Sequence, residues 1–327
     1  MTKLKLERVP GRKFRALRWS LQTLRFVGGL AGLSLLAVLA VDARADDEPP
    51  VAVATFSVLE NLVARVAGTE AEMRGLTPVG AEVHEWELSA RNFIDLEEAD
   101  IVFYNGHGLE QWMAQVREVA GEEARLVPLA ERIERETIPI QIGEMAGTID
   151  PHIWMDPAAA KQYVAVIRDT LSEADQDRAD TYSANAEAAV AEIAEARREA
   201  DELMACIPDE QRVLITSEAA FLYFSDAFGF DHDGIWGTNA EDEGTPAQMM
   251  RIVDLIAERQ PPAIFWESTI SERYVRSVSE DTGVPTAGPL YVDSLGEEGS
   301  GAESYTGMLL SNARLLRETL GQSCEER

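Results

Sequence analysis

Residues 175–205, DQDRADTYSANAEAAVAEIAEARREADELMA, decide how the chain is organised. This stretch is rich in Ala, Glu and Arg, and no Gly or Pro occurs between Ala158 and Ile207, so the composition favours long helix. Its apolar residues recur at roughly helical spacing, at Tyr182, Ala189, Ile193 and Leu203. The central position of the stretch predicts a rigid connector between two lobes, with a surface helix of a single domain as the alternative.

On both sides of this helix, short apolar runs alternate with longer stretches of helical period, a pattern typical of parallel α/β architecture. The fold class predicted is therefore α/β, with two lobes that contain parallel sheets, joined by one long helix. Thr245, Pro246 and Gln248 form the pattern of a capping box at a helix start. The expected strands are Val51–Phe56, Leu76–Val79, Ile101–Tyr104, Val213–Thr216, Ala263–Trp266 and Leu290–Val292. Expected helices include Leu59–Val66, Leu109–Val119 and Ser311–Leu320, whereas residues 128–157 are expected to be loop-rich.

The composition excludes several classes of protein. With 46% hydrophobic and 27% charged residues among 327, the chain is globular and long enough for about two domains of roughly 150 residues each. A formal charge of −29 argues against nucleic-acid binding, which requires a basic face. Two cysteines exclude both a disulfide-rich scaffold and a cysteine-rich zinc module.

The first 45 residues differ in charge from the rest of the chain. They hold nine Lys and Arg against two acidic residues, which leaves a formal charge of −36 for the remainder. A sixteen-residue apolar run, Phe26–Val41, precedes Ala43-Arg44-Ala45, and this is the order of a secretory signal peptide. A retained membrane anchor is disfavoured because spanning takes about 20 apolar residues. We expect cleavage near Ala45, no lipid attachment since no Cys stands there, and a periplasmic protein without stable membrane insertion.

Two histidines and two acidic residues stand where a parallel sheet would bind a ligand. His84 and His152 lie in loops at the ends of expected elements, and Glu218 and Asp293 follow expected strands almost directly. Each residue alone would more often be structural or solvated, but open α/β sheets bind ligands beyond the carboxyl ends of their strands. Imidazole suits Zn, Fe and Mn, and carboxylates favour harder ions such as Mn²⁺. The four residues are therefore candidate metal ligands between the lobes.

Six segments together resemble a known family of proteins. They are VHEWE at 83–87, LEEADIVFYNG at 96–106, DPHIWMDP at 150–157, TSEAAF at 216–221, IWGTNAEDEGTP at 235–246 and YVDS at 291–294. In this order, from about residue 51 to the C-terminus, the chain resembles the metal-binding lipoproteins and periplasmic receptors of ABC transporters for manganese, iron and zinc, which form solute-binding protein family 9.

The resemblance implies a fold and a ligand set. It implies two α/β lobes joined by one long rigid helix, with the metal held between the lobes. His84 and His152 would be the ligands of the N-terminal lobe, and Glu218 and Asp293 those of the C-terminal lobe. Glu rather than His at the third position, together with the lack of a His-rich acidic loop, resembles the manganese and iron members. One Mn²⁺ or Fe²⁺ ion is therefore favoured, and Zn²⁺ stays possible because it binds such sites tightly.

Residues near the expected ligands carry further expectations. His107 stands where the family more often has an apolar residue, so we expect a surface or supporting histidine, with a role in metal passage as the alternative. Asp150 and Asp156 flank His152 and are candidates to orient its ring, although Asp-Pro pairs are also ordinary turn formers. The segment after His84 lacks the Pro that the family usually has, which predicts a different loop there.

These inferences predict a periplasmic receptor that binds one divalent transition metal ion and delivers it to the membrane permease of an ABC transporter. We expect a monomer without catalytic activity; the alternative is an exported metallohydrolase, which would need an open coordination position and a general base. The chain divides into a signal peptide (1–45), an N-terminal lobe (46–174), a connecting helix (175–205) and a C-terminal lobe (206–327). Cys206 and Cys324 are expected to form a disulfide, with two unpaired thiols as the alternative.

Overall fold

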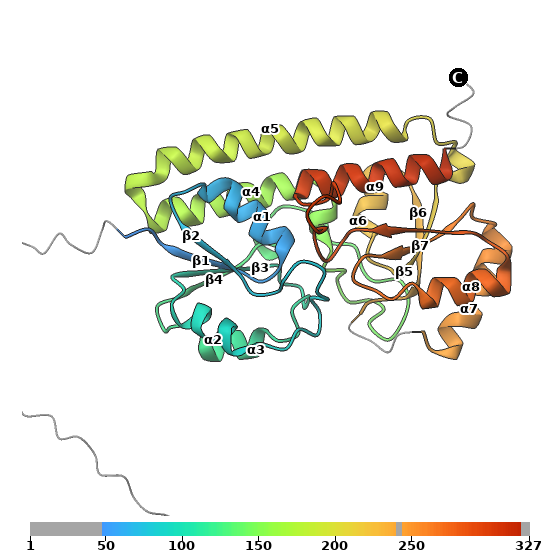
Figure 1. Ribbon diagram of the computed structural model, residues 1–327, viewed down its shortest axis with the longest axis horizontal. Helices are drawn as coiled ribbons and strands as arrows, with labels where there is room; N and C mark the ends of the chain where they lie inside the picture. The colour runs from blue at the N-terminus through green and yellow to red at the C-terminus, as the bar shows by residue number, and fades with distance from the viewer. Residues whose placement is uncertain (1–47, 240–243, 322–327) are drawn as a thin grey trace, which may run out of the picture. The chain divides into compact units, whose positions relative to one another are not determined.

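The computed structural model describes residues 48–239 and 244–321, and within these residues the chain forms two parallel four-stranded sheets (Figure 1). Their strand orders are β2-β1-β3-β4 and β6-β5-β7-β8, so the predicted α/β class is confirmed. The predicted signal peptide and Cys324 lie outside the described residues. The strands are β1 (Val51–Ala54), β2 (Glu72–Gly75), β3 (Ile101–Tyr104), β4 (Arg125–Pro128), β5 (Val213–Glu218), β6 (Asp231–Trp236), β7 (Ile264–Glu267) and β8 (Thr286–Leu290).

Helices connect the strands and cover the two sheets. None of the described helices combines the length and the apolar character needed to cross a membrane. The predicted capping box is confirmed: the Thr245 side chain accepts a hydrogen bond from the Gln248 backbone N–H at the start of α7. The helices are α1 (Ser57–Ala67), α2 (Ala90–Glu97), α3 (Met113–Val119), α4 (Pro157–Ala174), α5 (Ala179–Met204), α6 (Leu222–Phe228), α7 (Pro246–Arg259), α8 (Arg273–Thr282) and α9 (Tyr305–Leu320).

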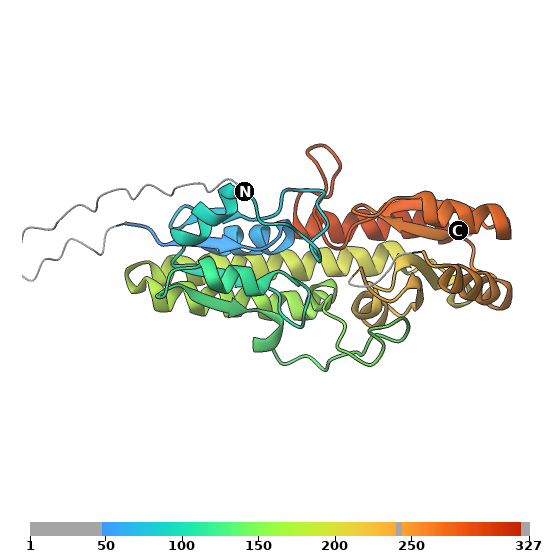
Figure 2. The same ribbon diagram turned by 90° about the horizontal axis from the view of Figure 1, so that it is seen from below.

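The long helix α5 belongs to both halves of this part of the chain. It packs against α4 and α1 beside the first sheet and against α9 beside the second, and Figures 1 and 2 show it running past both sheets. Tyr182, Ala189 and Ile193 are buried as their spacing predicted, whereas Leu203 is only partly buried. The helix is separated from α4 at Asp175, whose side chain accepts a hydrogen bond from the Arg178 backbone N–H. One long helix therefore joins the two α/β lobes.

A single cluster of buried apolar side chains continues from the first sheet to the second. It includes Phe56 and Trp154 of the first lobe, Tyr182 of α5, and Phe221 and Leu316 of the second lobe. Trp154 also donates a hydrogen bond from its Nε1 to the backbone oxygen of Val292, at 3.1 Å. Because protein interiors are close-packed and stiff, this continuous core holds the loops of the two lobes in a defined arrangement.

The strands that differ from the prediction are the edge strands of both sheets. The central strands β1, β3, β5 and β7 lie at or within two residues of their expected bounds. The edge strand β2 lies four residues before the expected run, β8 is also displaced, and β4 and β6 were not predicted. Edge strands are half exposed here and carry charged residues such as Arg74 and Asp231, so hydropathy alone does not reveal them.

Candidate metal centre

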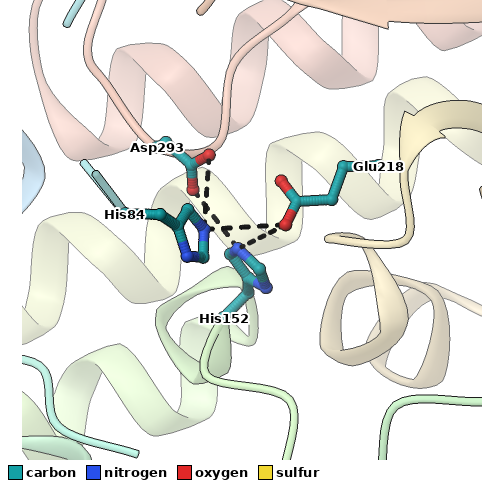
Figure 3. A group of neighbouring side chains, drawn as sticks. All are labelled: His84, His152, Glu218 and Asp293. Atoms are coloured by element: carbon teal, nitrogen blue, oxygen red, sulfur yellow. Dashed lines mark ion pairs between the residues drawn. The ribbon is translucent and has the colours of Figure 1, made fainter. Parts of the chain in front are cut away.

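Four side chains from different loops meet between the lobes (Figure 3). His84 lies in the loop between β2 and α2, and His152 begins the short 3₁₀ turn Ile153–Met155 before α4. Glu218 is the last residue of β5, and Asp293 follows β8 by three residues. Among the described residues, these four form a group of His and carboxylate side chains whose ligand atoms all lie within 4.8 Å of one another. The group combines two imidazoles from the first lobe with two carboxylates from the second.

The separations between these atoms suit a single bound ion. His84 Nε2 lies 3.6 Å from Glu218 Oε1 and 4.0 Å from Asp293 Oδ2. His152 Nε2 lies 3.3 Å from Asp293 Oδ1 and 3.8 Å from Glu218 Oε1. A tetrahedral ion with bonds of about 2.1 Å has neighbouring ligands roughly 3.4 Å apart. One divalent cation at the centre of the group could therefore contact all four residues.

The polar atoms of the group are buried without partners of their own. Each of the four residues is at most 1% exposed. Among the described residues, His84 Nε2, His152 Nε2, Glu218 Oε2 and both carboxylate oxygens of Asp293 have no hydrogen-bond partner. Buried polar atoms are costly unless they are paired, and a cation would satisfy all of these acceptors at once. The donor set therefore fits a metal ion.

His152 is held in position by its neighbours. Its Nδ1 lies 2.6 Å from Asp150 Oδ1, which also accepts a hydrogen bond from the His152 backbone N–H at 3.1 Å. The carboxylate fixes Nδ1 as the protonated nitrogen and leaves the Nε2 lone pair directed at the group. The expectation for Asp150 is thus confirmed, but Asp156 does not touch His152: it caps α4 through the Ala158 N–H and pairs with Arg135.

Glu218 is fixed by contacts to both its side chain and its backbone. The Asn239 backbone N–H donates to Glu218 Oε1 at 2.7 Å, and this same oxygen faces the Nε2 atoms of His84 and His152. The backbone N–H groups of Ser217 and Glu218 donate to the Glu267 carboxylate at 3.2 and 2.9 Å. Neither Asn239 nor Glu267 was predicted. Glu267 could have been found, because it is a charged residue at the end of a buried apolar strand.

The loops that carry His84 and Asp293 are tied to each other. The backbone N–H of Gly80 donates to the Ser294 hydroxyl at 2.7 Å, and the N–H of Leu295 donates to the Ser57 hydroxyl at 3.0 Å. Ser57 and Ser294 are buried and lie 3.2 Å apart between their hydroxyl oxygens. These contacts join the two lobes directly beside the four ligand candidates.

The charges of the group shift its pKa values in different directions. Burial lowers the pKa of His84 to about 4, so this imidazole is neutral at physiological pH. Burial alone would lower the pKa of His152, but the charges of Asp150 and Glu218 outweigh it and raise that pKa. Burial, reinforced by Asp293, raises the pKa of Glu218 well above its usual range. Without a cation, the group therefore retains a proton on the pair His152 and Glu218.

The other two histidines are not part of this group. His107 follows Gly106 in a loop with a positive φ of 50°, and its backbone N–H donates to Glu131. His232 lies on the edge strand β6 with its Nε2 2.9 Å from the Thr216 hydroxyl. Burial lowers the pKa of His232 to about 3, which keeps it neutral.

Replacing Asp150 by asparagine is expected to weaken metal binding by about tenfold to a hundredfold, the usual effect of removing a carboxylate that orients a ligating histidine. The amide keeps the size of the side chain but removes the charge that makes His152 a stronger donor. Equilibrium titration of the metal-free protein with Mn²⁺ measures the change. Asp156→Asn is a matched change at the residue directly after the 3₁₀ turn, where the side chain caps α4, and it should leave the affinity near its starting value. Equal effects of both variants would contradict the role of Asp150.

Known proteins that are similar to this chain are named for the metals that they bind. A family model described as zinc-uptake complex component A, periplasmic, matches residues 52–319. The manganese-binding lipoprotein MntA of Halalkalibacterium halodurans is 38% identical over 270 residues, which cover 83% of this chain and 88% of the relative. The iron-binding protein YfeA of Yersinia pestis is 35% identical over 271 residues, 83% of this chain and 86% of the relative. The solved periplasmic zinc-binding protein TroA of Treponema pallidum aligns with a TM-score of 0.76 and 26% identity, over 84% of this chain and 100% of that chain.

One prediction is contradicted by these comparisons. MntA is named as a lipoprotein, and further relatives carry the same word in their names. The expectation that the chain is not a lipoprotein was therefore wrong. It depended only on the lack of a Cys near Ala45, within residues 1–47 that lie outside the described part. It also left out a physical reason for anchoring: a receptor tethered beside its membrane partner gains a high effective concentration.

Proposed function

Because this chain belongs to the family of periplasmic zinc-uptake component A proteins, which its residues 52–319 match, we propose that it is an extracytoplasmic receptor for a divalent transition metal ion. It binds one ion and delivers it to the membrane permease of an ABC transporter. The observation that carries this proposal is the buried group of His84, His152, Glu218 and Asp293. The ion is the cargo of the protein, and these four residues are its proposed ligands.

The position of the ligands between the lobes explains how loading can be sensed. The first lobe supplies the imidazoles and the second supplies the carboxylates, so a bound ion links the two lobes. A ligand that binds preferentially to one arrangement of the two lobes stabilises that arrangement by mass action. The loaded protein then presents the surfaces of both lobes in one fixed relation, and a permease that contacts both lobes can distinguish it from the metal-free protein.

Mn²⁺ or Fe²⁺ is the proposed physiological cargo. Two carboxylates beside two imidazoles make the donor set harder than the all-nitrogen or thiolate sets that favour zinc. Of the three similar proteins described above, two are named for manganese and for iron, and the solved TroA structure is named for zinc. Zn²⁺ is expected to bind at least as tightly in purified samples, because affinity for divalent ions rises along the series from Mn²⁺ toward the late metals. Metal content must therefore be measured in protein exported by its own host.

Titration of chelator-treated protein with Mn²⁺ in a calorimeter tests the proposal. We expect saturable binding of one ion per chain, because the four donors surround a single position. Removal of the ion by a competing chelator should restore the metal-free protein, which should then bind Mn²⁺ again. A titration without saturable binding of Mn²⁺, Fe²⁺ or Zn²⁺ would overturn the proposed function.

The same sample separates this function from the metallohydrolase alternative. A catalytic site keeps a coordination position open for water and places a general base beside it. Here four side chains converge on one position, and neither of the relatives described above is named as a hydrolase. We propose that the protein has no catalytic activity and expect no turnover of ester, peptide or phosphoester substrates by the metal-loaded protein; metal-dependent turnover would favour the alternative.

We also propose the division of the chain that the sequence suggested. The helix α5 (Ala179–Met204) falls within the connecting segment 175–205, with the N-terminal lobe in 46–174 and the C-terminal lobe in 206–327. Residues 1–45 are proposed as the export signal. The protein is proposed to act as a monomer, which light scattering of the purified chain can test.

A further inference from the structure

Among the described residues, each lobe contains one buried glutamate that is not a ligand candidate. Glu110 follows β3 in the first lobe and is 3% exposed, and Glu267 ends β7 in the second lobe and is fully buried. Within the described residues, neither carboxylate forms an ion pair with Lys or Arg. A buried carboxylate without a cation is costly, so hydrogen bonds must compensate it.

Both carboxylates accept hydrogen bonds from consecutive backbone N–H groups. Glu110 accepts from Asn105 at 2.7 Å and from Gly106 at 3.3 Å, and the Thr55 hydroxyl donates to it at 2.8 Å. Glu267 accepts from Ser217 at 3.2 Å and Glu218 at 2.9 Å. Burial disfavours the ionised form of each carboxylate, and these hydrogen bonds favour it.

The groups joined by these hydrogen bonds lie at the carboxyl ends of the two central strands of each sheet. Thr55 directly follows β1 and Asn105 directly follows β3, so Glu110 joins these two ends. In the second lobe, β5 pairs with β7 at Ile215 and Ile264, two residues before Ser217. The Glu267 side chain therefore supplies the acceptors for the last two residues of β5 where the strand ladder no longer does.

The strand ends bound by each glutamate are linked directly to a proposed metal ligand. Asn105, held by Glu110, donates from its Nδ2 to the Pro151 oxygen at 2.8 Å, and Pro151 immediately precedes His152. Tyr163 of α4 fixes the same amide by donating to Asn105 Oδ1 at 2.7 Å. On the other side, Glu267 binds the backbone of Glu218 itself. Through these hydrogen bonds, Glu110 is connected to the backbone next to His152, and Glu267 is connected to the backbone of Glu218.

We propose that Glu110 and Glu267 are positioning residues of the metal site, whose carboxylates join the central strand ends of each sheet and so fix His152 and Glu218 before the ion arrives. This proposal rests on the proposed function. A site whose ligands are held in place loses less conformational freedom on binding and releases its ion more slowly. Neither glutamate touches the ion; each acts through the backbone of the segment that carries a ligand.

Glu110→Gln and Glu267→Gln test the proposal with little change in volume. In glutamine one acceptor oxygen becomes an NH₂ group, which cannot accept a hydrogen bond from the second backbone N–H. We expect the chelator-driven release of Mn²⁺ in a stopped-flow experiment to be at least about tenfold faster in each variant. The ligand-field absorption of the Co²⁺-loaded protein should change as well, because the ligand geometry around the ion is altered. The matched control is Glu303→Gln, since Glu303 also accepts from a loop N–H, that of Gly299, but is exposed.

A measurement on the unaltered protein tests the proposal even where a variant fails to fold. Amide hydrogen exchange of the metal-free protein should show slow exchange at Asn105, Gly106, Ser217 and Glu218, with protection equal to that of the strand cores. Rapid exchange at these amides would overturn the proposal, as would variants that release Mn²⁺ at the same rate as the unaltered protein and the Glu303→Gln control. Failure of the unaltered protein to bind Mn²⁺, Fe²⁺ or Zn²⁺ would instead overturn the proposed function. The exchange experiment would still show whether Glu110 and Glu267 hold the backbone N–H groups that they bind.

Discussion

Glu218→Gln is expected to weaken Mn²⁺ binding by roughly a thousandfold. Glu218 Oε1 lies within 3.8 Å of the Nε2 atoms of both His84 and His152, so its charge is at the centre of the group. Losing a buried charge that pairs with a bound partner costs about 2–5 kcal/mol of binding free energy, and each 1.4 kcal/mol corresponds to about a tenfold change in affinity. The amide oxygen can keep the hydrogen bond from Asn239, so the loss would reflect charge and coordination rather than collapse of the loop.

The same variant is expected to be more stable than the unaltered protein when both are metal-free. Burial raises the pKa of the Glu218 carboxyl, and Asp293 reinforces this, so its ionised form opposes folding at neutral pH. A neutral amide removes that opposition, and we expect the melting temperature to rise by a few degrees, about 1 kcal/mol of stability. Sites that bind cations commonly give up stability for function in this way.

Calorimetric titration and thermal unfolding of the two metal-free proteins measure both effects. The control is Glu195→Gln, an exposed position on α5 paired with Arg198, which should change neither quantity appreciably. Binding by Glu218→Gln within tenfold of the unaltered protein would show that Glu218 is not a ligand. A lower melting temperature would show that its role is structural.

The central strands could be predicted from the sequence and the edge strands could not, for one physical reason. A central strand of a parallel sheet is buried on both faces, so its residues are apolar in an unbroken run, as in Ile101–Tyr104. An edge strand is covered on one side only, so β2 and β6 contain charged residues and have no such run. Their existence follows from hydrogen bonding to a neighbour, which hydropathy does not report.

The ligand candidates could be predicted for a related reason. Glu218 ends a strand, Asp293 lies three residues beyond one, and the two histidines lie in loops that precede helical segments, and a polar residue between apolar runs is conspicuous at such places. The residues that support them are less visible. Asn239 acts through its backbone N–H, which carries no residue-specific signal. Glu267 acts on the backbone of another strand, so its partner could be identified only once the strand order was known.

The affinity for Mn²⁺ is expected to fall about a hundredfold between pH 8 and pH 6, because the ion must displace a proton. Asp150 and Glu218 raise the pKa of His152 despite its burial, and burial raises the pKa of Glu218, so the metal-free pair holds a proton that binding must expel. A displaced proton changes the affinity about tenfold per pH unit. His84, with a pKa of about 4, is already neutral and contributes nothing over this range. At lower pH the pair His152 and Glu218 keeps its proton, so the affinity for Mn²⁺ is lower.

Calorimetric titrations in buffers of different ionisation enthalpy should give the release of about one proton per Mn²⁺ bound at pH 7. Asp150→Asn is the informative partner variant, because it removes the nearest charge that raises the pKa of His152. Its affinity should be lower at pH 8 but should depend less on pH, so the two curves approach each other as the pH falls. A pH-independent affinity of the unaltered protein would show that the group is already deprotonated without metal. Parallel curves for the two proteins would show that His152 is not the proton carrier.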